Sequence, residues 1–334
     1  MKLPRFLCVA VFSLCLAAAG SVHAEDRPWV VYEGKEGPGK GKSIVLLSGD
    51  EEYRSEEGLP ELAKILAEEH GFKCTVVFSI NPKTGEIDPG TKNNEPGLEA
   101  LDSADLCIML LRFREWPDEQ MKHFVDFVNA GKPIIALRTA THAFSYNGKS
   151  ESPYKKYSYN AKEWPGGFGK QVLGETWVNH WGSHKHQATK GIIEPGAESD
   201  PILRGVKDIF GTTDVYEAHP PADVKVLVRG QVLTGMNPTD PALEGPKNSP
   251  MQPIVWTRSW TGESGKTNKI LTTTMGAATD LENEDLRRLL VNGVYSFLGM
   301  EVPAKAKVDI IGDYKPSFYG FGGQKKGTMP KSLQ

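Results

Sequence analysis

The run SIVLLSGDEEYR at residues 43–54 decides the fold class of this chain. Its first six residues are largely apolar, and Gly49 ends the run just before a charged cluster that begins at Asp50. A short apolar run that stops at such a break is typical of a central strand in a parallel sheet, buried on both faces. We therefore expect an α/β sheet, with Asp50 and its neighbours in the loop beyond the carboxyl end of this strand.

The segments that follow alternate between helical and strand patterns. Apolar residues recur at helical spacing from Leu59 to Leu66, and His70-Gly71 stops that helix. Further strands are predicted at 72–80, 106–111 and 133–137, with a long turn-rich loop at 81–96 and a helix at 117–130. Four strands that alternate with helices predict a doubly wound, mostly parallel α/β sheet.

The second half of the chain is less regular. Residues 139–195 are rich in Tyr, Trp, Gly and His, which indicates an elaborated insertion. Later strands are predicted at 224–228, 253–257 and 269–274, and a final helix at 282–298. We expect one domain over 43–300 and an extended tail over 301–334, whose aromatic residues pack along the body: Tyr314, Phe318, Tyr319 and Phe321.

Composition narrows the class of protein. The 334 residues are 39% hydrophobic and 24% charged, with a net charge of −3. This balance excludes a disordered, collagen-like or multi-span membrane protein, and it gives no electrostatic reason to expect a nucleic-acid partner. No glycine-rich dinucleotide motif follows the first strand and no phosphate-binding loop is present, so we expect no cofactor.

The amino terminus resembles a secretory signal peptide. Lys2 and Arg5 precede an apolar run at 6–19, and Val22-His23-Ala24 offers small residues for cleavage before Glu25. The apolar run is short for a membrane anchor, the alternative interpretation. We expect a signal peptide at 1–24, a polar leader at 25–42, a secreted or periplasmic location, and no membrane contact after cleavage.

Two cysteines, Cys74 and Cys107, remain after that cleavage. Both lie in apolar, strand-like runs. Buried free thiols are favoured over a disulfide, and two cysteines are too few for a disulfide framework.

The carboxyl ends of the predicted strands give a candidate site. Loops converge there in an open parallel sheet, so they bring together charged side chains that are distant in the sequence. We expect Asp50, Glu52 and His142 to be catalytic, and Arg54, Arg112 and Arg138 to bind substrate. The alternatives are a solvated first helical turn for the acidic residues and a capping role for Arg138 and His142. No Ser or Cys stands at the step after residue 137, which excludes thiol chemistry of the glutaminase type there.

The insertion adds imidazole and indole groups. His180, His184 and His186 follow Glu175, but Trp181-Gly182-Ser183 argues against a helix that would carry a histidine pair for a metal. We predict no metal and assign Glu175, Trp177, His180, Trp181 and His184 to substrate binding, because aromatic faces stack on sugar rings. Structural histidines and a second hydrophobic core under the insertion are the alternatives.

Three segments carry a family resemblance. They are SGDEEYR at 48–54, ALRTATHAF at 136–144 and FGKQVLGETW at 168–177, supported by PILRG at 201–205 and DVYE at 214–217. With them, the chain resembles the ThuA-like family, named for trehalose utilisation, over about 42–299. The resemblance implies a flavodoxin-like fold, of the class I glutamine-amidotransferase type without its catalytic Cys, and a link to carbohydrate metabolism. It supplies no catalytic residues.

Two functions remain open from the sequence. The first is a secreted enzyme that hydrolyses or otherwise converts a sugar or glycoside by acid/base chemistry. The second is a non-catalytic carbohydrate-binding or scaffold protein. In both cases the expected partner is a small carbohydrate, and the sequence does not determine the oligomeric state.

Overall fold

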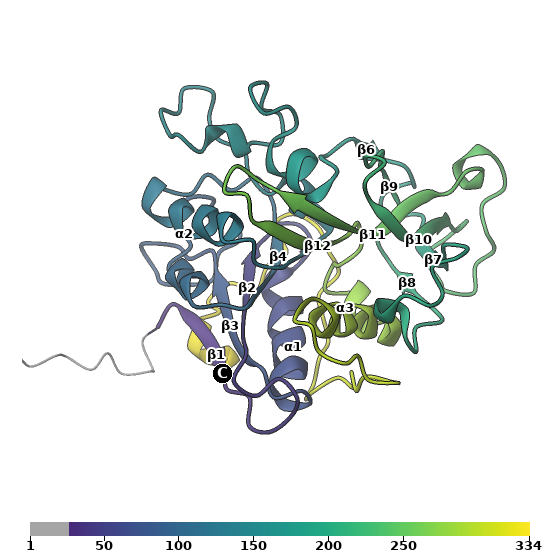
Figure 1. Cartoon of the computed structure of the whole chain (residues 1–334), viewed down its shortest axis with the longest axis horizontal. Helices are drawn as coiled ribbons and strands as arrows, with labels where there is room; N and C mark the ends of the chain where they lie inside the picture. The colour runs from purple at the N-terminus through teal and green to yellow at the C-terminus, as the bar shows by residue number, and fades with distance from the viewer. Residues whose placement is uncertain (1–26) are drawn as a thin grey trace, which may run out of the picture.

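The structure, a computed structural model, describes residues 27–334 (Figure 1). The expected signal peptide at 1–24 lies outside the described residues. Three α-helices are present in the described part: α1 Ser55–Glu68, α2 Asp118–Asn129 and α3 Glu284–Phe297. Among residues 27–334, no helix has the length and apolar character needed to cross a membrane.

One ten-stranded sheet organises the fold, in the order β1-β3-β2-β4-β5-β12-β11-β10-β7-β8. Its parallel core is β3-β2-β4-β5-β12. The bounds of these core strands, in that order, are Lys73–Phe78, Ser43–Gly49, Leu106–Leu111, Ile134–Leu137 and Thr267–Thr273. The remaining strands pair antiparallel: β1 Trp29–Tyr32, β11 Gln252–Thr261, β10 Lys225–Val232, β7 Thr189–Ile193 and β8 Phe210–Gly211.

Both faces of the core are covered, as the continuous apolar strands predict. Successive side chains of a strand point to opposite faces, so Leu46 packs with α1 and α3 while Leu47 packs with α2. Figure 1 shows α2 apart from α1 and α3. The doubly wound α/β prediction is therefore confirmed for the first half. In the second half, β12 joins the parallel core and the other strands of this sheet pair antiparallel, so the whole sheet is mixed around a parallel core.

The insertion contains short elements instead of a helix–strand repeat. They are η3 Arg138–His142, η4 Lys155–Tyr157, a π-helical turn η5 Gly169–Leu173, and a separate two-stranded sheet of β6 Asn179–His180 and β9 Tyr216–Glu217. The other short helices are η2 Leu98–Asp102, η6 Pro201–Leu203, η7 Pro246–Asn248, η8 Asp280–Glu282 and η9 Pro330–Leu333.

Two terminal segments extend the sheet and cover it. Residues 25–42 were expected to hold no element, but Trp29–Tyr32 forms β1 and pairs with β3. The carboxyl end returns to β1, where the Tyr32 hydroxyl donates to the Leu333 carbonyl at 2.5 Å (Figure 1). Tyr319 of the tail is buried, as expected, whereas Phe318 and Phe321 are exposed. Cys74 and Cys107 are buried free thiols, which confirms that interpretation.

Candidate functional site

An ion pair between Arg138 and Asp214 lies at the centre of the site. Arg138 is the first residue after β5, and Asp214 lies in the loop between β8 and β9. Both side chains are fully enclosed, and Nη2 of Arg138 donates to Oδ1 of Asp214 at 2.9 Å. The other guanidinium contacts fix Arg138 further, because Nη1 donates to the carbonyls of Asp214 and Thr274 at 2.7 Å each. The guanidinium is therefore locked in one position.

The backbone of Arg138 is left-handed, with φ +43°. An L-residue in this region carries a penalty of about 1–2 kcal/mol, which the surrounding contacts must offset. The ion pair and hydrogen bonds of the Arg138 guanidinium offset this penalty. The Arg138 amide also donates to the Met275 carbonyl at 3.0 Å. Aromatic rings enclose the guanidinium, whose carbon lies 3.6 Å from the Tyr216 centroid and 4.7 Å from that of Tyr53.

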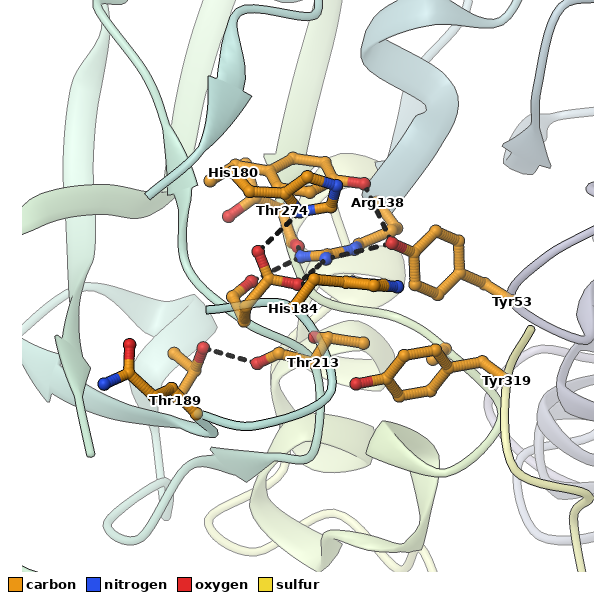
Figure 2. Close-up of polar contacts among 12 residues, drawn as sticks. Tyr53, Arg138, His180, His184, Thr189, Thr213, Thr274 and Tyr319 are labelled. Atoms are coloured by element: carbon orange, nitrogen blue, oxygen red, sulfur yellow. Dashed lines mark hydrogen bonds and ion pairs between the residues drawn. The ribbon is translucent and has the colours of Figure 1, made fainter. Parts of the chain in front are cut away.

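The loop that carries Asp214 is held from the sheet side by Asp280. This buried carboxylate accepts the Thr213 amide at 3.0 Å and the Thr213 hydroxyl at 2.7 Å. It also accepts the Gly276 amide at 2.9 Å, beyond the end of β12. Thr189 adds a 2.6 Å hydrogen bond to the Thr213 carbonyl (Figure 2). These contacts place Asp214 beside Arg138 before any ligand arrives.

Two imidazoles converge on the same carboxylate. His180 Nδ1 lies 2.7 Å from Asp214 Oδ2, and His184 Nδ1 lies 3.0 Å from Oδ1. The ring centroids of the histidines are 4.6 Å apart. Figure 2 shows both rings gathered at the Arg138 guanidinium, with Tyr53 and Tyr319 beside them. Their side chains are 34% and 25% exposed, so the cluster is open to solvent on this side.

Glu52 completes the cluster from the loop after β2. Its Oε1 lies 3.2 Å from His184 Nε2, so His184 bridges two carboxylates. The hydrogen bonds to Asp214 and Glu52 raise the pKa of His184 to about 9. Burial alone would raise the pKa of Asp214, but Arg138 and the two imidazoles hold it below its ordinary value. The cluster is therefore built to retain positive charge between two carboxylates.

A wall of aromatic rings borders the cluster. Trp177 is half-buried, and its ring lies 4.9 Å from His180, 4.7 Å from Tyr216 and 5.2 Å from His142. His142 is buried, with Nδ1 3.0 Å from the Thr141 hydroxyl. Burial, and after it the charge of Arg112, hold the pKa of His142 well below its usual range. His142 is thus a neutral imidazole beside Trp177.

The carboxyl-terminal tail forms the opposite wall. Tyr319 is buried against Tyr53 and His184, at centroid distances of 5.2 and 5.5 Å. The tail is pinned by the Tyr319 hydroxyl, which donates to the Thr212 carbonyl at 2.9 Å, and by the Gly320 amide, which donates to the Glu52 carbonyl at 2.7 Å. A segment almost 270 residues beyond the loop after β2 therefore shapes the same site.

Comparison with known proteins now identifies the family. A family model described as ThuA, trehalose utilisation, matches residues 43–295. The chain belongs to the ThuA family. That membership links it to trehalose and carbohydrate utilisation.

Solved structures of ThuA-like proteins are similar to this chain. One from Parabacteroides merdae ATCC 43184 has a TM-score of 0.49 and 14% identity, over 79% of this chain and 92% of that chain. Another from Bacteroides uniformis ATCC 8492 has a TM-score of 0.45 and 15% identity, over 79% and 93% of the two chains. The comparison with curated proteins gives no match.

The candidate site contains several residues that the sequence singled out. The structure brings Glu52, Arg138, His142, Trp177, His180 and His184 together around Asp214. Arg112 borders the cluster, with Nη1 2.6 Å from Glu51 Oε1 and Nε 3.7 Å from Glu52 Oε2. Its guanidinium also stacks on Phe113 and the exposed Phe321, at 4.5 and 5.0 Å. Arg112 is thus a half-exposed cation at the rim.

Asp50 and Arg54 lie beneath the site rather than on its open side. Both are buried. Asp50 Oδ1 accepts the amides of Glu52 and Tyr53 at 2.7 Å each, and Oδ2 accepts the Thr139 hydroxyl. Asp50 therefore ties the loop after β2 to η3. Arg54 has a left-handed backbone and donates from Nη2 to the Gly320 carbonyl, which holds the tail.

Glu175 and Trp181, like Arg54, are expected binding residues that the structure places outside the open side of the site. Glu175 is buried, pairs with Lys170 at 2.8 Å, and accepts the amides of Thr176 and His219. Trp181 follows directly after β6, at a bend, and its side chain lies away from the Asp214 cluster. It packs against the main core and donates from Nε1 to the Lys247 carbonyl at 2.8 Å. Both contacts are structural.

The sequence assigned no place in the site to Asp214, Tyr216 or Tyr53, and it assigned Tyr319 only to packing of the tail along the body. The segment DVYE at 214–217 carries only the family resemblance, and Tyr53 lies in the run that indicates the fold class and carries the same resemblance. No local spacing marks Asp214, because its partners Arg138 and His184 lie 76 and 30 residues away. Only the packing of the insertion against the sheet edge reveals it.

Proposed function

We propose that this ThuA-family protein binds a sugar or glycoside at the cluster around Asp214 and converts it by acid/base chemistry, with hydrolysis as the leading reaction. The observation that carries the proposal is the contact of Trp177 with His180 at 4.9 Å, with ring planes at 76°. An indole suited to the apolar face of a sugar thereby adjoins imidazole and carboxylate groups that can exchange protons.

Each group then has a role set by its position. Trp177 stacks on the sugar ring, while His180 and Glu52 contact its hydroxyls or exchange protons with them. Arg112, half-exposed at the rim, orients hydroxyls or holds developing negative charge. Arg138 and Asp50 do not reach the sugar; they position Asp214 and the loop after β2. His142, neutral and buried, supports the Trp177 ring rather than shuttling a proton.

A second candidate is a carbohydrate-binding protein without turnover. One observation favours it: of the three residues expected to be catalytic, Asp50 and His142 are buried, at 0% and 3% exposure, with both Asp50 carboxylate oxygens and His142 Nδ1 already hydrogen-bonded. Glu52 is the one of these three residues whose side chain contacts a partly exposed group, the His184 imidazole. Binding without chemical change in the ligand distinguishes this function from the first.

The test is a panel of disaccharides, including trehalose, and 3-keto-glycosides, assayed for binding by calorimetry and for products by chromatography. We expect Trp177→Ala to weaken binding and Glu52→Gln to abolish product formation while binding persists. Trp181→Phe is the matched control, since Trp181 lies four residues away and packs against the core. Binding that ignores Trp177, or that responds equally to Trp181, overturns the site. Binding by the wild type without product selects the second candidate.

The location of the protein stays a proposal drawn from residues 1–24. We propose export with cleavage after Ala24. Mass spectrometry of the mature amino terminus and fractionation of producing cells test it. A protein that keeps Met1 and stays in the cytosol contradicts it.

A further inference from the structure

The histidine pair and Asp214 have the geometry of a metal site. One ligand atom from each of His180, His184 and Asp214 can be chosen so that all three lie within 4.8 Å of one another. Imidazole nitrogens and carboxylate oxygens bind Zn²⁺ and similar ions at about 2.0–2.2 Å, which places such atoms a few ångströms apart. We infer that these three residues bind a divalent transition-metal ion.

The groups behind the ligands fit this assignment. Arg138 donates to Asp214 Oδ1, whereas Oδ2 faces His180 Nδ1 at 2.7 Å, so an ion can replace the proton that these two ligand atoms share. On the far side of His184, Nε2 lies 3.2 Å from Glu52 Oε1 while Nδ1 faces Asp214. A ligating histidine characteristically donates its second ring N–H to a carboxylate, because this fixes the tautomer and the ring orientation. His184 has that arrangement.

The ligands are also held in place before binding. Asp214 is fixed by the Asp280 contacts to Thr213 and by Arg138. His180 is held between the Trp177 ring at 4.9 Å and the β6–β9 pairing with Tyr216. A preorganised set of ligands loses little conformational entropy when an ion binds, which favours affinity.

Three protein ligands leave coordination positions open, and the histidines are half-exposed, so these positions face solvent. Metal sites that use three protein ligands and keep an open position are typical of catalysis rather than of structural support. Two imidazoles and one carboxylate favour ions such as Zn²⁺, Fe²⁺ or Ni²⁺ over Ca²⁺ or Mg²⁺, which prefer oxygen ligands. The inference deepens the proposed function: the ion would hold a water or a sugar oxygen beside Trp177. Only this role of the ion rests on the proposed sugar site; the binding of the ion by the three ligands does not.

Direct titration with Zn²⁺ tests the inference without any sugar. The purified protein is treated with a chelator, dialysed, and titrated calorimetrically, with Ni²⁺ and Mg²⁺ in parallel. We expect one Zn²⁺ per chain, no stoichiometric Mg²⁺ binding, and loss of the Zn²⁺ site in His180→Ala/His184→Ala. Glu52→Ala should weaken Zn²⁺ binding by about 10–100-fold, because the partner of His184 is lost.

The matched control is His186→Ala/His219→Ala, which removes two other histidines of the same region. His186 is exposed, and His219 pairs with Glu217 instead of Asp214. Equal loss of Zn²⁺ in this control and in the site variant overturns the inference, as does a wild type that binds no Zn²⁺. A wild type that binds no Zn²⁺ means that His180, His184 and Asp214 share protons and hold no metal ion.

A second readout guards against misfolding of the double variant. Co²⁺ loaded in place of Zn²⁺ gives a visible absorption band that reports its ligands. We expect the single variant His180→Gln to keep the wild-type circular dichroism spectrum and to change this band. An unchanged band excludes His180 as a ligand. The sugar assays described above are scored separately, so a sugar site without a metal and a metal site without a sugar remain distinguishable.

Discussion

The guanidinium of Arg138 and the carboxylate of Asp214 form an ion pair in which neither side chain reaches solvent, with Nη2 and Oδ1 2.9 Å apart. Arg138 comes from the end of a parallel strand, and Asp214 comes from the loop between β8 and β9. The pair therefore joins the carboxyl edge of the parallel sheet to the carboxylate that contacts His180 and His184. Loss of either partner leaves a buried charge without compensation.

We expect Arg138→Met to destabilise the protein by about 3–5 kcal/mol, since it leaves the Asp214 carboxylate unpaired in the interior. Urea denaturation followed by circular dichroism measures the free energy of unfolding. Lys40→Met is the control, because the Lys40–Glu36 pair is exposed and contributes little. A similar, small effect of both variants would contradict the structural role of Arg138.

The tail should contribute measurably to stability through Tyr319. Tyr319→Phe removes the hydrogen bond to the Thr212 carbonyl, at a cost of about 1 kcal/mol. Tyr319→Ala also removes ring contacts with Tyr53 and His184, and should cost about 3–5 kcal/mol. The neighbouring Phe318→Ala is the control, because that ring is 51% exposed. Denaturant titration compares the three, and equal costs for Tyr319→Ala and Phe318→Ala would show that the tail is not docked.

Asp50 should stabilise the loop after β2 by accepting hydrogen bonds from the backbone of that loop. Asp50→Ala leaves the buried amides of Glu52 and Tyr53 without an acceptor, and we expect a loss of more than about 2 kcal/mol. Asp50→Asn keeps an oxygen for both amides and should recover most of that loss. Thermal unfolding of the two variants gives the comparison. A catalytic Asp50 predicts the reverse: stability kept in both variants, with turnover lost in Asp50→Asn.

Stability should depend on pH through Glu56. Burial raises the pKa of this carboxyl group from 4.5 to about 8. Between these pH values the folded chain binds a proton that the unfolded chain has released, so the free energy of unfolding falls as pH rises from 4.5 to 8. One proton gives a slope of up to about 1.4 kcal/mol per pH unit.

Glu56→Gln isolates that effect because the amide does not titrate. The stability of the variant relative to the wild type should increase steadily from pH 5 to pH 8 and then level off. Urea titrations at pH 5, 6.5, 8 and 9 measure the difference. Other titrating groups, such as Glu95, act on both proteins alike and cancel. Parallel pH profiles for the two proteins would mean that Glu56 is ionised when folded.

Much of the candidate site is predictable because the loops after parallel strands meet at one edge of the sheet. Glu52, Arg112 and Arg138 each stand just after an apolar strand run, so their gathering at one sheet edge is predictable from order alone. This convergence of loops places backbones, not side chains. It therefore does not reveal that Asp50 turns inward to bind amides, or that consecutive residues His180 and Trp181 face opposite sides.

The amino-acid sequence by itself determined the parallel core of this protein, because uninterrupted apolar strands that end at polar loops have few other ways to become buried. Tertiary structure alone decided the centre of the site. Arg138 meets Asp214 across 76 residues, and Tyr53 meets Tyr216 across 163. Contacts over such distances leave no periodic trace in the chain, since they depend on how the segments beyond the parallel strands pack against the edge of the sheet.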